Sequence, residues 1–318
     1  MTSSIYYEIT PHSAWDYLGR FARLLSMPES EMQQFVEKLA SGNLSIGVSA
    51  LYYFLHSNKL PLTKLFQLEF AKHAADDREK ALVTTDEIIE GLLAIHYPFF
   101  DVDKSPLLNV FKGFDEIPKD FRKTLVIPRI LGILASGKLK FRTLIARLGK
   151  AGYPPDIAYE AFDRCLQKGL FGCSWGHKVD HFEESSDASV RLSRCGKLYW
   201  NHLLWRASYL QYVCEDVEME EKWQVPILDK YEELSSGSRH MQSRLNAVRK
   251  FVLFIESEEE AEKEWICRKG RNYTDHLTEF GVREGKTGRA TATTLSAHMK
   301  KTVLPYVRTL LQGRDGHR

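Results

Sequence analysis

The sequence predicts a mainly α protein in which a helical bundle is followed by a winged helix-turn-helix and a C-terminal helical region. Apolar residues recur at helical spacing in the first hundred residues and again in the last third. Between them, residues 127–201 show three short helices, two strands and a closing helix, the element order of a winged helix. The expected ranges are 1–113 for the bundle and connector, 114–215 for the winged helix and 216–318 for the C-terminal region.

Short amphipathic helices account for the first hundred residues. Their expected apolar faces are Met32, Phe35, Val36 and Leu39; Ala50, Leu51, Phe54 and Leu55; Leu62, Leu65, Phe66, Phe70 and Ala71; and Ile88, Ile89, Leu92 and Leu93. Thr84 and Glu87 have the spacing of a capping box, in which each side chain satisfies an orphan backbone N–H group. Residues 97–113 contain Pro98 and Pro106 and no helical period, so we expect an extended connector.

The winged helix is predicted from spacing and from turn residues. Its first two helices have apolar faces at Ile127, Ile130, Leu131 and Leu134, and at Phe141, Leu144, Ile145 and Leu148. The turn at 149–155 precedes a third helix, which we expect to begin at Asp156 and to end at Gly169. Strands at 170–175 and 188–193 then flank a polar wing at 178–187. Ser193 can cap one closing helix, which carries Tyr199, Leu203, Ala207, Leu210 and Cys214.

The last third combines one apolar stripe with two charge blocks of opposite sign. The stripe consists of Met241, Leu245, Val248, Val252 and Ile255, and it is typical of a core helix or of a helix–helix interface. Residues 256–264 contain six acids and one lysine, whereas the final fifty residues are basic. This basic tail can bind nucleic acid or an acidic partner, or it can fold back on the acidic run. We expect a final helix at about 293–311.

Composition sets broad limits on function. A chain of 318 residues with 43% hydrophobic residues, 27% charged residues and a net charge of +2 is typical of a globular protein without an obligate polyanion partner. Five cysteines at irregular spacing argue against a disulfide framework. Residues 1–13 lack a basic stretch followed by an apolar run, and no segment reaches about 18 apolar residues. We therefore expect neither a signal peptide nor a membrane span, and a cytoplasmic location.

Motifs that would identify an enzyme are not found in the sequence. Residues 281–287 end in Gly-Lys-Thr like a phosphate-binding Walker A loop, but the spacing is one residue short and the preceding segment is polar. Cys173, His177 and His181 are zinc-ligand types, but they lack the paired cysteines of a structural zinc site. We therefore expect no catalytic residues, no cofactor and no metal.

Several segments resemble a known family. They are Gly42-Asn43-Leu44 at a helix start, Ile-Ile-Glu-Gly-Leu-Leu at 88–93, the connector at 100–111 and the winged helix. Together, over about residues 30–215, they resemble the C-terminal half of bacterial P-loop ATPases of the AAA/STAND type, which implies a helical lid followed by a winged helix. Ser45 stands where many such lids carry a basic residue that reaches the nucleotide phosphates. The family's nucleotide-binding core has no counterpart in this sequence.

Two surfaces of the winged helix are candidate binding sites. The third helix offers Asp156, Tyr159, Glu160 and Asp163, whose carboxylates would repel DNA and therefore favour protein docking. Cations on and before the second helix could hold phosphates without reading sequence, or could form a solvated helix face: Lys138, Lys140, Arg142, Arg147 and Lys150.

The expected function is that of a non-enzymatic adaptor or regulator that docks onto a protein partner, either a P-loop ATPase or a second copy of the chain. The alternative is a nucleic-acid-binding protein that holds DNA with the basic second helix and the C-terminal tail.

Overall fold

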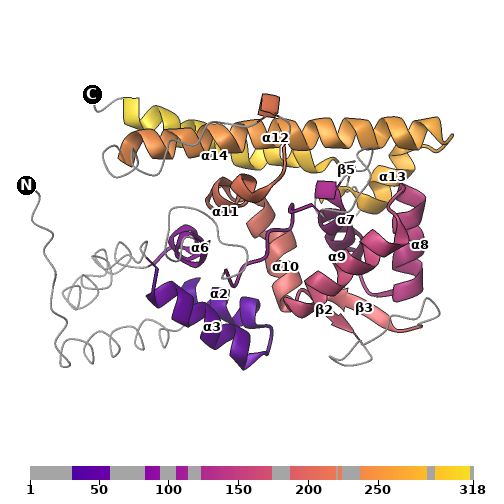
Figure 1. Cartoon of the computed structure of the whole chain (residues 1–318), viewed down its shortest axis with the longest axis horizontal. Coiled ribbons are helices and arrows are strands. Elements are labelled where there is room, and N and C mark those ends of the chain that lie inside the picture. The colour runs from indigo at the N-terminus through magenta and orange to yellow at the C-terminus, as the bar shows by residue number, and fades with distance from the viewer. Residues whose placement is uncertain are drawn as a thin grey trace, which may run out of the picture.

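The computed structural model describes residues 31–57, 83–93, 105–113, 123–173, 187–219, 221–223, 237–284 and 291–315. Within these ranges the protein is mainly helical, as predicted, with eleven α-helices and two small sheets. Figure 1 shows two long helices side by side along one edge of the molecule, with the N-terminal helices and the sheet-containing unit beneath them. Buried apolar side chains from all three expected ranges belong to one contiguous core.

Three N-terminal helices are described, and two of them begin at capping residues. They are α2 (Glu31–Ala40), α3 (Leu44–Leu55) and α6 (Thr85–Leu93). Asn43 caps α3 by accepting a hydrogen bond from the Ser45 N–H at 3.0 Å. The capping box before α6 is confirmed, because the Thr84 N–H donates to Glu87 Oε2 at 2.9 Å and the Glu87 N–H donates to Thr84 Oγ1 at 3.4 Å. The apolar face expected at 62–71 lies outside the described residues.

The described part of the connector, residues 105–113, is largely buried, and residues 97–104 lie outside the described residues. Residues 105–113 contain neither helix nor strand, as expected, and their backbone is held by two tyrosine hydroxyls. The Leu108 N–H donates to Tyr199 Oη at 2.6 Å, while Tyr209 Oη donates to the Leu108 carbonyl at 2.6 Å and accepts from the Val110 N–H at 3.2 Å. These bonds satisfy backbone groups that no regular ladder pairs, and they allow the connector to cross the core.

The prediction of one closing helix after Ser193 is wrong. The chain instead forms α10 (Arg194–Asn201), η3 (Leu203–Trp205), α11 (Ala207–Val213) and η4 (Cys214–Asp216). The Tyr199 and Tyr209 rings lie 6.1 Å apart between centroids, whereas ten residues of straight helix advance about 15 Å. The break at His202–Arg206 therefore brings both hydroxyls to the same stretch of connector. Ser193 does cap α10, because its Oγ accepts from the Gly196 N–H at 3.0 Å.

The middle unit follows the expected order with one addition. After η2 (Lys123–Leu125) come α7 (Val126–Ala135), β1 (Leu139–Lys140), α8 (Phe141–Ala151), α9 (Pro155–Gln167), β2 (Phe171–Cys173) and β3 (Ser189–Leu192). The three strands form an antiparallel sheet in the order β1-β3-β2, with Leu139 opposite Val190 and Phe171 opposite Leu192. β1 was not predicted, because a two-residue strand shows no alternation of apolar and polar residues. Residues 174–186, which include most of the expected wing, lie outside the described residues.

The C-terminal region is a helical hairpin with a small sheet between its arms. After η5 (Glu221–Trp223) it comprises α12 (Gly237–Arg268), α13 (Tyr273–Phe280), β4 (Val282–Glu284), β5 (Thr291–Thr293) and α14 (Leu295–Asp315). The described members of the apolar stripe, Leu245, Val248, Val252 and Ile255, are buried and are therefore core. Residues 281–284 of the Walker-like segment follow α13 and enter β4, whereas residues 285–287 lie outside the described residues. A helix rather than a strand precedes the segment, unlike the order of a phosphate-binding loop.

Candidate functional site

The acidic face of α9 lies at the surface, but two of its three carboxylates have partners on the same helix. Asp156 is exposed in the first turn. Glu160 accepts a hydrogen bond from Arg164 Nη2 at 3.3 Å, and Asp163 accepts one from Gln167 Nε2 at 2.6 Å. These contacts hold the side chains along α9 without removing their negative charge.

Tyr159 differs from the acids around it because it is half-buried. Its ring lies 5.7 Å from that of Phe141, centroid to centroid, and Phe141 belongs to the core under α8. One edge of Tyr159 therefore fixes α9 against α8 while the rest of the ring remains accessible. Half-buried aromatic rings of this kind are common anchors in protein interfaces.

The cations predicted on and before α8 are at the surface, and three of them face acids. Lys140 Nζ and Arg142 Nη2 lie 3.1 Å and 3.5 Å from the same oxygen of Asp187. Arg147 Nε lies 2.9 Å from Glu279 Oε1 on α13. Lys138 and Lys150 are exposed.

Asp187 shows how these surface charges act on one another. The hydrogen bond from Lys140, together with the charges of Lys140 and Arg142, lowers the pKa of Asp187 below its ordinary value. More than half of each of the three side chains is exposed, so solvent and salt can screen the attraction.

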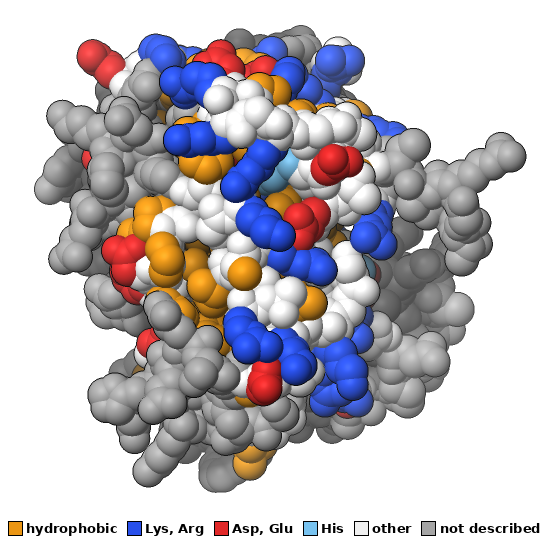
Figure 2. Space-filling view, turned by 90° about the vertical axis from the view of Figure 1, so that its right-hand side faces the viewer, with side chains coloured by type: hydrophobic (Ala, Val, Ile, Leu, Met, Phe, Trp, Pro, Cys, Tyr) orange, Lys and Arg blue, Asp and Glu red, His pale blue; other side chains and the backbone are white. Residues whose placement is uncertain are grey.

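Cations from the C-terminal region lie beside the α8 surface, and this proximity was not predicted from the sequence. The Arg271 guanidinium donates to the backbone carbonyl of Lys150, at the end of α8. Arg268 and Lys269, at and just after the end of α12, are also exposed. Figure 2 shows Lys and Arg side chains gathered over this side of the molecule, with few acids among them. No local pattern in the sequence links residue 271 to residue 150.

The fold-back expected for the basic tail is observed in part. Lys300 on α14 pairs with Glu256 on α12. Glu259 caps α14 from α12, because its carboxylate accepts from the Leu295 N–H at 2.8 Å and from the Ser296 N–H at 2.9 Å. The acidic run therefore contacts α14 through Lys300 and through the N-terminus of that helix. Arg268, Lys269 and Arg271 are instead exposed beside α8.

A buried ionic cluster joins the middle unit to the C-terminal hairpin. Arg129 of α7 is fully buried, and its Nη2 lies 2.9 Å from Glu259 Oε1 and 2.5 Å from Glu262 Oε2. Tyr153 Oη donates to Glu262 Oε1 at 2.7 Å, and His276 Nε2 lies 3.4 Å from Glu262 Oε2. The cluster was not predicted, although Arg129 stands out in the sequence as an arginine inside the apolar run of 126–134.

Electrostatics within this cluster favour the charged form of Glu262. Burial would raise the pKa of Glu262, but the Arg129 charge and the hydrogen bonds from His276 and Arg129 outweigh it and lower that pKa to about 2. Removal of one partner would leave a charge in the core, so the cluster acts as a structural joint.

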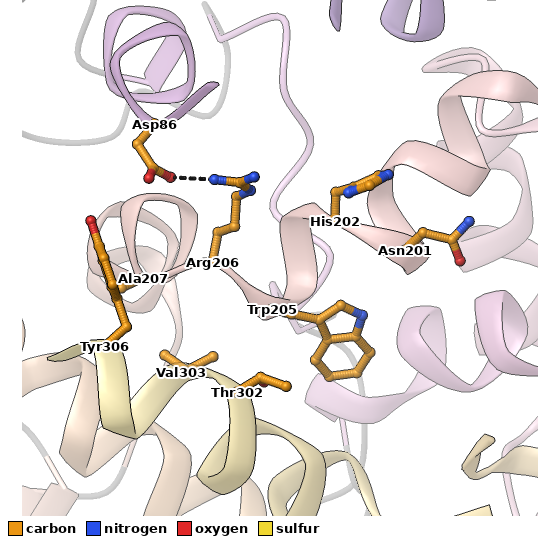
Figure 3. A pocket seen from close by; sticks show the side chains of 9 residues that line it. All are labelled: Asp86, Asn201, His202, Trp205, Arg206, Ala207, Thr302, Val303 and Tyr306. Carbon is orange, nitrogen blue, oxygen red and sulfur yellow. Dashed lines mark hydrogen bonds and ion pairs between the residues drawn. The ribbon is translucent and has the colours of Figure 1, made fainter. Parts of the chain in front are cut away.

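An open cleft of about 320 Å³ lies between α6, the α10–α11 break and α14 (Figure 3). Asp86 accepts from Arg206 Nη1 at 3.0 Å and from Ser208 Oγ at 2.6 Å. Burial lowers the pKa of His202, and the charges of Lys38 and Arg206 lower it further. None of the predicted site residues lines this cleft. The Asp86 carboxylate already accepts hydrogen bonds from two donors. This arrangement suits a structural contact better than acid–base chemistry.

The zinc candidate gains no support from the part of it that the structure describes. Cys173 is half-buried on β2, and His177 and His181 lie outside the described residues. Cys165 and Cys195 are buried, and burial raises the pKa of the Cys195 thiol to about 12. Across the described ranges, no group of three or more His, Cys, Asp and Glu side chains is arranged to hold a metal ion.

Comparisons with protein-family models, curated proteins and solved structures gave no match to this chain. No helix in the described part of the chain is long and apolar enough to span a membrane.

Proposed function

We propose that residues 123–216 form a winged helix-turn-helix and that the chain is a non-enzymatic adaptor or regulator, which docks onto a protein partner through α9. The order α7-β1-α8-α9-β2-β3, with an antiparallel sheet in the order β1-β3-β2, supports the first part of the proposal. In that arrangement α9 takes the place of the recognition helix, so its exposed side chains determine the kind of partner.

The acidic surface of α9 is the observation that carries the proposal. Asp156 and Glu160 are exposed, and α9 carries three acids against a single cation, Arg164. Arg164 pairs with Glu160, and Lys168 Nζ donates to the Ser105 carbonyl at 3.5 Å. A helix with this charge would lie against DNA phosphates at an electrostatic cost, whereas a basic protein surface would complement it.

The packing of α9 against its neighbouring helices also suits docking. α9 packs on α7 and α8, and α7 is joined to α12 through the buried contacts of Arg129 with Glu259 and Glu262. A helix held by a packed core and by buried hydrogen bonds keeps its shape on binding, which lowers the entropic cost of association.

The partner that fits the resemblance of residues 30–215 is a P-loop ATPase, on another chain or within an assembly of this one. In that family the lid and the winged helix follow a nucleotide-binding core along the chain. The proposal is therefore that α9 contacts such a core or its neighbour and that the chain itself catalyses no reaction.

Affinity capture with wild-type and charge-reversed baits tests this proposal. Wild-type protein is expected to recover a P-loop ATPase from the source cell, and the double variant Asp156→Lys/Glu160→Lys is expected to lose it. Glu221→Lys, an exposed acid on η5, is the matched control and should retain the partner. A photo-crosslinking residue in place of Tyr159 should form a cross-link to the ATPase.

Two results would contradict the proposal. One is equal recovery of the ATPase by the double variant, with all three baits shown to be folded by circular dichroism. The other is repeated recovery of the chain alone, combined with a monomeric mass from light scattering, because that pair of results leaves neither an ATPase nor a second copy as the partner.

A further inference from the structure

We infer that the side of the molecule formed by α8, the end of α12 and the residues before α13 is a binding surface for the phosphodiester backbone of duplex nucleic acid. We call this surface the cationic band and define it by Lys138, Lys140, Arg142, Arg147, Lys150, Arg268, Lys269 and Arg271. It does not include α9 and does not depend on the docking proposed above.

Close packing makes the band one surface. The Arg271 guanidinium donates to the Lys150 carbonyl, and the Trp265 ring lies directly over Gly152, where an added Cβ would be 2.6 Å from it. Gly152 has a φ of +101°, the left-handed conformation that favours glycine, and this close approach also requires a residue without a Cβ. The end of α8 and the end of α12 are therefore fixed against each other.

Charge on the band is predominantly positive. Four acids lie within four residues of one of its eight cations in sequence or are paired with one, namely Asp187, Glu264, Asp275 and Glu279, which leaves an excess of four positive charges. The whole chain has a net charge of only +2, so the band concentrates charge that the rest of the molecule offsets. Figure 2 shows this concentration across the face.

The spacing of the cations suits a duplex. Arg142 and Lys150 lie eight residues apart on the solvent side of α8, which is about 12 Å along the helix axis. Duplex DNA presents one phosphate charge per roughly 1.7 Å of its axis, so the band can contact several phosphates at once. A hollow of about 310 Å³ near the end of α8 is lined by Lys150 and Arg271, and also by Asp275 and Glu279.

The chemistry of the band favours a duplex over a single strand and favours backbone contacts over base contacts. Single-stranded sites usually stack bases on accessible aromatic rings. Here Trp265 and Tyr273 are half-buried, and each has a lysine over its ring, Lys269 at 5.9 Å and Lys263 at 5.8 Å. Asn272 could read a base edge, but its Oδ1 already accepts from the Thr274 N–H at 2.9 Å.

The test is the salt dependence of binding to a short fluorescent DNA duplex, measured by anisotropy. Wild-type protein is expected to bind at low salt, with the logarithm of affinity falling by about 0.9 per contacted phosphate for each log unit of salt. The triple variant Arg268→Glu/Lys269→Glu/Arg271→Glu should reduce that slope by about 3 and weaken binding at least tenfold. Lys140→Glu, at the far end of the band, should reduce the slope by about 1.

Arg249→Glu is the matched control. Arg249 is exposed on the same helix as Arg268 but lies 19 residues earlier, roughly 28 Å away along the helix axis. Its reversal should leave the slope and the affinity unchanged, and circular dichroism should show all variants folded.

Four outcomes would overturn the inference. They are no binding of the duplex at low salt, equal losses in the band variants and in Arg249→Glu, equal or tighter binding of a single strand of the same length, and tighter binding of polyglutamate than of duplex at equal charge concentration. The last outcome would mark the band as a site for an acidic protein.

Discussion

The buried ionic cluster and the cationic band contain ion pairs of similar length in opposite surroundings. In the cluster, Arg129 meets Glu259 at 2.9 Å with both side chains at most 3% exposed. In the band, Lys140 meets Asp187 at 3.1 Å with side chains 56% and 65% exposed. The attraction is weakly screened in the first case and strongly screened in the second, so the same distance corresponds to different free energies.

This difference separates two uses of charge in one protein. The charges of the cluster make contacts across α7, α12, α13 and α14, and these contacts define how the helices meet. The charges of the band cost little to keep at the surface and remain available to a ligand. Four predictions test the distinction, from the largest expected effect to the smallest.

The largest loss of stability is expected for Arg129→Met, because it leaves Glu259 and Glu262 buried without their cation. Breaking a buried pair in this way costs about 3–5 kcal/mol, measurable as a lower free energy of unfolding in urea. The double variant Arg129→Met/Glu262→Gln should regain part of that loss. A loss under about 1 kcal/mol would contradict this prediction, because it would be no larger than the contribution of an exposed ion pair.

Acid should weaken the cluster through Glu262. Its pKa is about 2 in the folded protein against an ordinary value of 4.5, so its contribution is complete above the ordinary value and is lost as the pH falls toward 2. The shift corresponds to roughly 3 kcal/mol. Urea unfolding across this pH range should show a steeper loss for wild type than for Glu262→Gln. Parallel curves for the two proteins would contradict the assignment.

A buried hydroxyl should have an intermediate effect. Tyr209→Phe removes the partner of both the Leu108 carbonyl and the Val110 N–H in the core. Unsatisfied buried groups of this kind cost about 1–3 kcal/mol, which thermal or urea unfolding can resolve. Tyr306→Phe is the control, because the side chain of Tyr306 is 45% exposed and water can replace its contacts. Equal effects from the two substitutions would contradict the role of the Tyr209 hydroxyl in holding the connector.

The smallest effect on stability is expected for Asp187→Asn in the band, with an unfolding midpoint close to that of wild type. Added salt should instead move the pKa of Asp187 up toward its ordinary value, because both Lys140 and Arg142 are exposed and their attraction is screened. The pKa of Glu262 should not move. Carboxyl NMR titrations at low and high salt measure both groups, and a salt-insensitive Asp187 would show that the pair is shielded.

The sequence predicted the features that arise from interactions between residues a few positions apart, such as helix caps and helical spacing. Ser193 and the Thr84–Glu87 pair cap the helices they were expected to cap, and α3 begins at the expected Gly42-Asn43-Leu44 segment, where Asn43 is the cap. Helical spacing also placed α8 and α14 within a few residues of their observed bounds. The break at His202–Arg206 could not be predicted in the same way, because the apolar spacing from Tyr199 to Cys214 fits one helix. Only the hydrogen bonds of Tyr199 and Tyr209 to the connector account for two helices.

The sequence predicted which residues form the candidate surfaces, but not which side chains from other elements lie beside them. The exposure of Arg142 and Lys150 follows from their positions on an amphipathic helix. The pairing of Arg147 with Glu279 does not, because nothing in the spacing of either helix indicates that α8 and α13 meet.

By itself, the sequence determined which segments are helical, where many of them begin and which faces are apolar, because helical period and capping act over three or four residues. Tertiary structure alone decided that Arg129 meets a carboxylate 133 residues away, that Tyr209 holds a connector 101 residues before it and that Arg271 lies beside Lys150. Such contacts form only when helices pack, and local periodicity contains no information about which helices will do so.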